Sequence, residues 1–388
     1  MVKGGNNQNN YNFNSNSANL SHNQINNFNA NGNVVSPKTN VLSNIAKNLQ
    51  LNKDKFNLKS LVQSRLSKST ANFNLSNKLE NKTLNCFQVL KGHESAINCL
   101  MLLKGRDQEY LIITGGQDRE IKIWHYLTGE CLRTLSGHLD SISSLTKIRR
   151  KELIISTGDD KLIKIWEYNT GRCFKTLQGH THWIKKVILM KWDRNDSTIV
   201  TASSDKTIRV WNIDTDICNI LKGHKHEVIS LTQIKWLKDQ TTIASGSWKE
   251  IKLWNVITGD NISTFANNKN WIRSLLYLKY APENDYLVSA SNNEIKLWNL
   301  KTGKCVNSFD TEDSYINCIY ELKLKQKDIV VASAGSDKCV KLWNVETSKL
   351  ISRLAGHSDI IKGIAQPDKE DGVVILTASA DKTIRYWK

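Results

Sequence analysis

The chain has 388 residues, of which 54 are lysine or arginine and 37 are aspartate or glutamate, so its formal net charge is +17. No stretch approaches the roughly 18 consecutive apolar residues of a membrane-spanning helix, and the start lacks the basic, apolar and small-residue segments of a secretion signal. We therefore expect an intracellular protein, cytoplasmic or nuclear, with no transmembrane segment.

Residues 1–83 form a basic, asparagine-rich segment. The first 50 residues contain 17 asparagines and few large apolar side chains. Such a composition cannot bury enough surface to offset the entropy that is lost on ordering. Only residues 55–68 place apolar side chains near one helical face, with lysine and arginine beside them. We expect a mostly disordered tail with one candidate short helix at 55–68.

Residues 84–388 carry tryptophan at a nearly constant period. Successive positions are 42 to 45 residues apart, which is the length of one β-propeller blade, a small sheet that buries its faces against its neighbours. Short runs of β-branched and apolar residues alternate with turn residues, as expected for strands. The sequence therefore predicts an all-β fold, a seven-bladed propeller of four-stranded antiparallel blades. The tryptophans are Trp124, Trp166, Trp211, Trp254, Trp298, Trp343 and Trp387.

The two ends of this region complement each other. Only one residue follows Trp387, so the seventh repeat has three strands and would leave an unpaired edge. Residues 84–90 precede the first repeat in the position that fourth strands hold elsewhere, for example at 130–135. We predict that strand 84–90 pairs with the last blade and closes the ring.

A Gly-His pair precedes the first strand of five repeats. These pairs are Gly92-His93, Gly137-His138, Gly179-His180, Gly223-His224 and Gly356-His357. With the periodic tryptophan, they make residues 84–388 similar to the WD-repeat family, in which Gly-His lies before the first strand and the tryptophan closes the third. The family's Trp-Asp dipeptide itself is absent, since residues such as Glu167 and Asn212 follow the tryptophans. The resemblance implies a propeller that binds other proteins.

Spacing within the repeats predicts a structural hydrogen-bond relay. The loop histidine would contact the turn aspartate and a strand hydroxyl, and the hydroxyl would contact the indole. Each of these groups, if buried without a partner, would cost about 1–3 kcal/mol, so we expect them together. Four blades contain every member: His93, Thr114, Asp118 and Trp124; His138, Ser156, Asp160 and Trp166; His180, Thr201, Asp205 and Trp211; His357, Thr377, Asp381 and Trp387.

The other three blades depart from this pattern. Blade four has Trp248 at the aspartate position, blade five has Asn267-Asn268 in place of Gly-His, and blade six has Thr311-Glu312 there. Blade four keeps His224, and we interpret the relays of these three blades as degraded, each having lost its aspartate or its histidine.

Serine, histidine and aspartate together also suggest a hydrolase triad. Four copies, each with a tryptophan partner, favour a structural role instead. The sequence has no phosphate-binding glycine loop, nucleophile elbow or metal-ligand cluster either. We predict no enzymatic activity, no metal and no cofactor.

Eight cysteines raise the question of disulfides. Five of them occupy one repeated position in different blades, and no Cys-x-x-Cys pair suggests zinc. We expect buried free thiols.

Four aromatic residues lie in the loops and turns of one face. Trp183, Trp271 and Tyr315 come shortly after the Gly-His position of blades three, five and six, and Trp248 lies in the turn of blade four. We call these four residues the aromatic sector. Large aromatic side chains are enriched at binding hot spots, and in the family the positions that open the first strand contact peptides. We interpret the sector as the partner-binding site, with packing between blades as the alternative.

The net charge also allows a nucleic-acid partner. Residues 1–84 contain ten Lys or Arg and two acidic residues, whereas the remainder contains 44 and 35. Lys147-Ile148-Arg149-Arg150-Lys151 is the only dense basic run in the propeller, and we interpret it as a solvated hairpin turn. Nucleic acid binding is therefore a less favoured hypothesis.

The sequence favours a non-enzymatic scaffold that binds peptide segments of partner proteins within a hetero-complex. One alternative is the substrate receptor of a ubiquitin ligase. Against it, residues 1–84 show no F-box-like module and no arginine stands three residues after a repeat tryptophan. A second alternative is an RNA- or DNA-associated subunit that uses the basic tail.

Overall fold

The computed structural model describes residues 84–105, 109–236, 239–281, 284–311, 315–324, 329–368 and 373–388. Within these ranges the chain forms 28 strands and no helix. The strands make seven four-stranded antiparallel sheets, which confirms the predicted seven-bladed propeller. The tail predicted at residues 1–83, with its candidate helix at 55–68, lies outside the described residues.

In the first four blades, strands that follow one another in sequence are neighbours in the sheet. Blade one contains β2 (Ile97–Lys104), β3 (Tyr110–Gly116), β4 (Ile121–His125) and β5 (Cys131–Leu135). Blade two contains β6 (Ile142–Ile148), β7 (Leu153–Gly158), β8 (Ile163–Glu167) and β9 (Cys173–Leu177). Blade three contains β10 (Ile184–Leu189), β11 (Thr198–Ser203), β12 (Ile208–Asn212) and β13 (Cys218–Leu221). Blade four contains β14 (Ser230–Trp236), β15 (Asp239–Gly246), β16 (Ile251–Asn255) and β17 (Asn261–Phe265).

Blades five and six repeat this order, and blade seven combines the two ends of the propeller. Blade five contains β18 (Ser274–Ala281), β19 (Asn284–Ala290), β20 (Glu294–Asn299) and β21 (Cys305–Asp310). Blade six contains β22 (Ile316–Leu322), β23 (Val330–Gly335), β24 (Cys339–Asn344) and β25 (Lys349–Ala355). Blade seven contains β26 (Ile361–Ala365), β27 (Ile375–Ser379), β28 (Thr383–Trp387) and β1 (Cys86–Lys91).

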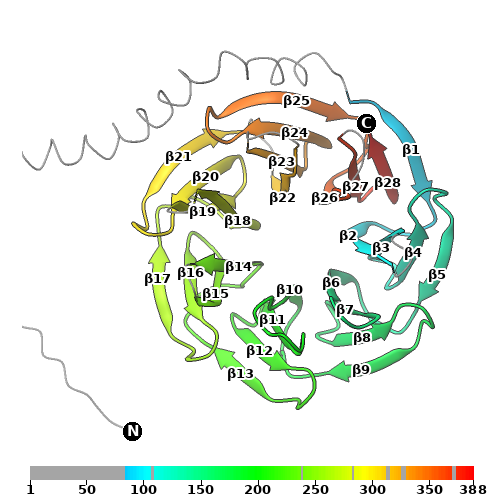
Figure 1. Ribbon diagram of the computed structural model, residues 1–388, viewed down its shortest axis with the longest axis horizontal. Helices are drawn as coiled ribbons and strands as arrows, with labels where there is room; N and C mark the ends of the chain where they lie inside the picture. The colour runs from blue at the N-terminus through cyan, green and yellow to red at the C-terminus, as the bar shows by residue number, and fades with distance from the viewer. Residues whose placement is uncertain are drawn as a thin grey trace, which may run out of the picture. The chain divides into compact units, whose positions relative to one another are not determined.

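The first strands of the blades surround the centre of the ring, and the fourth strands form its outer rim (Figure 1). Each first strand contacts the first strands of both neighbouring blades, and β26 contacts β2 where the ring closes. The residues of these inner strands therefore line a central channel.

The hydrophobic core lies between the blades. In one cluster, Ile113 and Ile123 of blade one pack with Ile154 and Trp166 of blade two. Successive side chains of a strand point to opposite faces of its sheet, and each blade has a neighbouring blade on both faces. Apolar side chains on either face are therefore buried between two blades. A fully buried isoleucine contributes about 2 kcal/mol. All seven repeat tryptophans are at most 6% exposed.

Strand β1 closes the ring as the fourth strand of blade seven. It pairs antiparallel with β28, with Cys86 opposite Trp387 and Lys91 opposite Thr383. Two further backbone bonds, from the Asn85 N–H to the Lys388 carbonyl (3.0 Å) and from the Lys388 N–H to the Asn85 carbonyl (3.1 Å), extend this ladder. The edge that the sequence leaves open on the last strand is thus fully paired.

The eight cysteines are all free thiols. Our expectation that they are buried is wrong for most of them. Cys131 and Cys305 are exposed, and only Cys339 is buried. The repeated cysteine position begins the outermost strand of a blade, where no neighbouring strand covers it.

Candidate functional site

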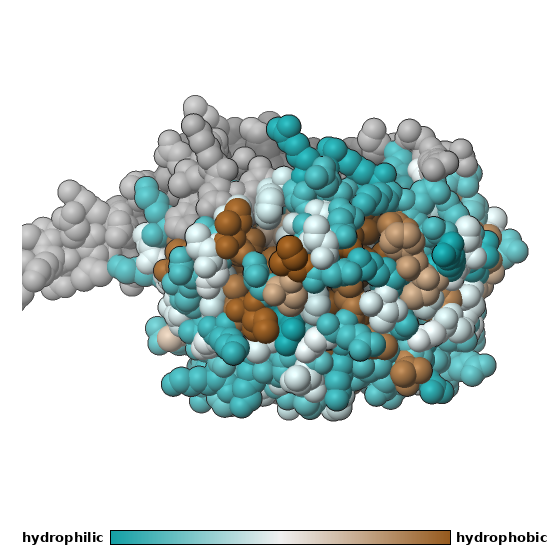
Figure 2. Space-filling view, turned by 90° about the horizontal axis from the view of Figure 1, so that it is seen from below, coloured by the Kyte–Doolittle hydropathy of each residue, from teal (hydrophilic) through white to brown (hydrophobic). Residues whose placement is uncertain are grey.

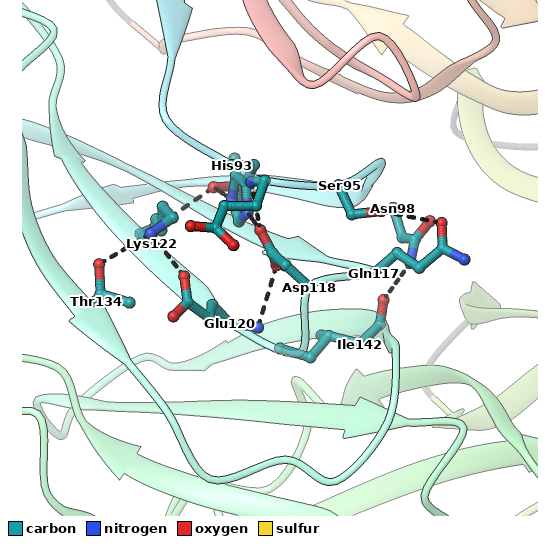
Figure 3. Close-up of polar contacts among 12 residues, drawn as sticks. His93, Ser95, Asn98, Gln117, Asp118, Glu120, Lys122, Thr134 and Ile142 are labelled. Atoms are coloured by element: carbon teal, nitrogen blue, oxygen red, sulfur yellow. Dashed lines mark hydrogen bonds and ion pairs between the residues drawn. The ribbon is translucent and has the colours of Figure 1, made fainter.

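In blade one, the four relay residues are hydrogen-bonded in a chain. The His93 imidazole contacts the Asp118 carboxylate through Nδ1 (2.7 Å) and the Thr114 hydroxyl through Nε2 (2.7 Å), and the Trp124 indole N–H donates to the same hydroxyl (2.9 Å). Figure 3 shows His93 above the turn that carries Asp118. The aspartate also accepts the backbone N–H of Glu94 (3.0 Å), so it joins the loop to the turn.

Blades two, three and seven have the same arrangement. The histidine–carboxylate and histidine–hydroxyl distances are 2.6–2.7 Å, and the indole–hydroxyl distances are 2.8–2.9 Å. The residues are His138, Asp160, Ser156 and Trp166; His180, Asp205, Thr201 and Trp211; His357, Asp381, Thr377 and Trp387. The structure therefore brings together all sixteen residues that the sequence assigned to relays.

The relay is consistent with a neutral histidine and an ionised aspartate. Burial holds the pKa of the His357 imidazole below its ordinary value, although Asp381 opposes this. Burial alone would raise the pKa of Asp381, but hydrogen bonds from Thr383 and His357 outweigh it and lower that pKa. With neutral histidine, Nδ1–H donates to the carboxylate and Nε2 accepts the hydroxyl proton, so every polar group has a partner.

The geometry resembles a catalytic triad, but the hydroxyl cannot meet a substrate. Ser156, the serine among the four, is 0% exposed, and its oxygen already accepts the indole N–H of Trp166. The relay therefore joins loop, turn and strand within each blade.

In blade four, our interpretation of a degraded relay is wrong. His224 contacts the Glu250 carboxylate (2.8 Å) and the Ser245 hydroxyl (2.7 Å), and the Trp254 indole donates to that hydroxyl (2.8 Å). A longer glutamate, four residues before the tryptophan, reaches the histidine that an aspartate contacts elsewhere. Its position is displaced by two residues from the expected one, which is occupied by Trp248.

Blades five and six retain the indole–hydroxyl bond without a histidine. The Trp298 and Trp343 indoles donate to Ser289 and Ser333, both at 2.8 Å. A buried lysine takes over the loop contact. In blade six, Lys341 Nζ donates to the Thr311 carbonyl (2.6 Å) and pairs with Asp337 (3.1 Å). Lys296 bonds the Asn267 carbonyl (2.6 Å) in blade five. Glu312 lies outside the described residues.

The aromatic sector lies on blades three to six, in loops fixed by backbone hydrogen bonds. The Trp183 carbonyl accepts the Ser204 N–H (2.9 Å), and the Tyr315 carbonyl accepts the Ser336 N–H (2.9 Å). Trp248 and Trp271 form an isolated β-bridge, and their rings lie 5.3 Å apart in an edge-to-face arrangement. For Trp248 and Trp271, the alternative role that we named, packing between blades, therefore applies at least to the contact between their two rings. Trp183 and Tyr315 are 43% and 53% exposed.

A cation lies beside each of three sector rings. The Lys185 ammonium lies 4.2 Å from the Trp183 ring, and Lys249 lies 5.2 Å from the Trp248 ring. The Arg273 guanidinium lies 5.6 Å from the Tyr315 ring. Such contacts hold both partners in place and add about 0.5–1 kcal/mol each at exposed sites.

The central channel opens between these residues as a cavity of about 710 Å³. Trp183 and Trp271 line it, whereas Trp248 and Tyr315 do not. Four cations line it as well, and the acidic residues of the lining are Asp159 and Glu227. The cations are Lys185, Lys186, Arg273 and Lys362. Asp159 pairs with Lys185 at 3.0 Å.

The lining cations are not among the site residues predicted from the sequence. The signal was present, because Lys185, Arg273 and Lys362 hold one repeated position, directly after a buried isoleucine of the repeat. The basic run at residues 147–151 lies on a turn as predicted, with Arg149 paired to Asp196 and Lys151 to Asp214.

The sequence was compared with models of known protein families. Seven consecutive stretches match the WD domain, G-beta repeat, and together they cover more than half of the chain. The chain belongs to the WD-repeat family. The matched stretches are residues 84–125, 129–167, 171–212, 216–255, 259–299, 303–344 and 348–388. Each WD repeat contains the outer strand of one blade and three strands of the next, which is why β1 starts the first repeat but completes blade seven.

Individual relatives match over short stretches. The chain is 35% identical over 66 residues to the Danio rerio protein named WD repeat and SOCS box-containing protein 1, covering 17% of this chain and 15% of that protein. It is 38% identical over 65 residues to human WD repeat-containing protein 41 (16% and 14%). It is 37% identical over 65 residues to Arabidopsis thaliana Pre-mRNA-processing factor 19 homolog 2 (17% and 12%). The matches span less than a fifth of each relative, so they concern the repeat rather than the whole proteins.

Two further observations concern the described residues. No helix among them is long and apolar enough to cross a bilayer. No cluster of three or more histidine, cysteine, aspartate or glutamate side chains in this part of the chain is placed to hold a metal ion.

Proposed function

We propose that this WD-repeat chain is a non-enzymatic interaction scaffold that binds acidic peptide segments of partner proteins within a hetero-complex. The binding site is the channel mouth on the Gly-His face, beside the aromatic sector. The observation that carries the proposal is the placement of Trp183 and Trp271 in the lining of the cavity, next to Lys185 and Arg273.

The aromatic rings favour a peptide. Trp183 is half-exposed although it is large and apolar, and burying such a ring under a partner yields much of the energy at binding hot spots. Its loop is held by the Ser204 N–H, so little ordering entropy is lost on binding.

The charges favour an acidic peptide. Four cations and two acidic residues line the cavity. One of the acids, Asp159, is already paired with Lys185, and the other, Glu227, accepts the Ser204 hydroxyl (2.9 Å). The lining therefore retains a positive excess that complements carboxylates.

A peptide-display selection on the full chain tests the proposal. We expect the enriched peptides to be rich in aspartate and glutamate. Their affinity for a Trp183→Ala, Trp271→Ala variant should fall by tenfold or more, at about 1.4 kcal/mol per tenfold.

The matched control is Phe174→Ala, which removes another exposed aromatic ring (56% exposed) from the outer strand β9. It should leave peptide affinity unchanged. Enrichment of neutral or basic peptides, or equal affinity loss in both variants, would reject the proposed site.

The other two functions remain hypotheses with weaker support. The ligase-receptor hypothesis is supported only by the similarity to a relative whose name includes a SOCS box, and that similarity covers 66 residues. The nucleic-acid hypothesis depends on the basic tail, which lies outside the described residues. Comparing salt-dependent retention on nucleic acid with and without residues 1–83 tests the latter.

A further inference from the structure

A second repeated feature lies on the face opposite the Gly-His loops. Lysine recurs at intervals of 43 or 44 residues near the end of the first strand of each blade except the seventh. We call the five whose side chains the structure describes the lysine ring. They are Lys104, Lys147, Lys191, Lys235 and Lys323. The sixth position in the sequence is Lys279.

The strand positions place the lysine ring around the second mouth of the channel. Lys104 is the last residue of β2, Lys147 is the next-to-last of β6, and Lys323 directly follows β22. The inner strands all start at the Gly-His face and surround the centre (Figure 1). Their ends therefore meet at the opposite face of the propeller, across the channel axis.

The electrostatics agree with this placement for four of the five ring lysines. Burial lowers the pKa of the Lys191 amino group, and repulsion from Lys235, Arg149, Lys323 and Lys147 lowers it further. These neighbours stand on blades two, four and six, whereas Lys191 stands on blade three. Lys191 is therefore repelled by cations of three other blades, and this repulsion opposes folding.

Two cations of this region have acidic partners among the residues that the structure describes. Lys323 pairs with Asp368 at 2.5 Å, and Arg149 pairs with Asp196. Glu321 is half-buried, and burial raises the pKa of its carboxyl. In the described part of the chain, no ion pair involves Lys147, Lys191 or Lys235.

Solvent reaches both the rim of the propeller and two lysines of the ring. Figure 2, which looks at the edge of the ring, shows polar residues covering most of this view, with apolar ones in patches among them. The side chains of Lys191 and Lys235 are solvent-exposed and accessible to a soluble anion, although surrounding atoms partly desolvate the Lys191 amino group and lower its pKa.

We propose that the lysine ring binds a compact small molecule that carries several phosphate groups. Lysine ammonium groups bind phosphate as point charges, and ring geometry suits a compact ligand because one molecule on the axis reaches lysines of several blades at once. An extended polymer would meet them only along one line. The bound anion would remove the repulsion around Lys191 and stabilise the fold.

Calorimetric titration of the full chain with inositol hexakisphosphate tests this site. The ring variant carries Lys147→Gln, Lys191→Gln and Lys235→Gln. The control carries Lys185→Gln, Lys186→Gln and Lys362→Gln, the same charge change at the other mouth. We expect about tenfold weaker binding for each ring lysine that is replaced, and less than about threefold change in the control.

Thermal unfolding supplies a second measurement. Without ligand, the ring variant should unfold at the same temperature as the native chain or higher, because like charges have been removed. The ligand should raise the midpoint of the native chain and not that of the ring variant.

Several outcomes would overturn the proposal. These are equal binding by the ring variant and the native chain, equal weakening in the ring and control variants, or tighter binding of polyglutamate or single-stranded RNA of matched charge. The last outcome would assign the ring to a macromolecule.

Discussion

Blades one, two, three and seven differ from blades four, five and six in how they attach the Gly-His loop to the rest of the blade. The first group uses histidine and aspartate throughout, whereas blade four uses Glu250 and blades five and six use a buried lysine. All seven blades keep the tryptophan indole bonded to a strand hydroxyl. The indole–hydroxyl bond is therefore the constant element of this fold, and the loop attachment is the variable one. Three of the four aromatic-sector residues lie on the variable group.

The tryptophan with its indole–hydroxyl bond should contribute equally to the free energy of unfolding in both groups of blades. Trp211→Ala in blade three and Trp298→Ala in blade five each remove a ring that is at most 3% exposed and leave its hydroxyl partner with one bond fewer. We expect each to lower the free energy of unfolding by about 3–5 kcal/mol, measured by urea unfolding. A much smaller loss in blade five would mean that its tryptophan has a different role.

The histidine–carboxylate contact should contribute more to the free energy of unfolding in the blade whose carboxylate is more buried. His180→Ala removes the histidine partner of the Asp205 carboxylate, which is 5% exposed, whereas His224→Ala removes that of Glu250, which is 20% exposed. Urea unfolding should give a loss of about 1–3 kcal/mol for His180→Ala and less for His224→Ala. The reverse order would contradict the assignment of Glu250 as the substitute.

The lysine substitute of blade six should contribute to stability as well. Lys341→Met removes the donor to the Thr311 carbonyl and the ion-pair partner of Asp337. Because Lys341 is 3% exposed, we expect a loss of about 1–2 kcal/mol. Lys164→Met is the matched control, since Lys164 holds the same repeat position and its bond to Thr176 is exposed. That variant should change the free energy of unfolding by less than about 0.5 kcal/mol. Equal values would show that blade six does not depend on its lysine.

Lowering the pH should reduce the free energy of unfolding through the histidine relays. The change for each titrating group should be smaller than that of any destabilising substitution above. The pKa of His357 lies below the value of about 6.5 in an unfolded chain, so the unfolded state binds the proton first and stability falls as the pH drops below about 6.5. The pKa of Asp381 is also lowered, so its contribution is present above about pH 4 and is lost as the pH falls through the folded value. Urea unfolding between pH 8 and pH 3 measures both steps. A stability that rises between pH 7 and pH 5 would contradict neutral relay histidines.

The sequence was sufficient to predict the ring because its information is local and repeated. The tryptophan recurs seven times at intervals of 42 to 45 residues, and in four blades the histidine, hydroxyl and aspartate accompany it, which excludes coincidence. The free edge at Trp387 and the strand-like residues 84–90 likewise determine which segments pair.

The substitute contacts in blades four to six could not be predicted, because they depend on the length of a side chain and not only on the spacing of residues in the sequence. Glu250 meets His224 because its side chain is longer than that of aspartate, although it stands two positions away from the expected one. Lys341 reaches the loop only because its stem is buried. Trp271 turns to the channel while Trp248 packs on its ring, a difference that their loop and turn positions do not determine.

Hydrogen exchange of the full chain, with and without an acidic peptide from the display selection, tests the central claim most directly. We predict slower exchange at the channel-mouth backbone, in residues 181–187 and 270–275, and unchanged exchange in the outer strands β9 and β13. Protection confined to the outer strands, with none at Trp183 or Trp271, would contradict the proposal that the aromatic sector is the peptide-binding site.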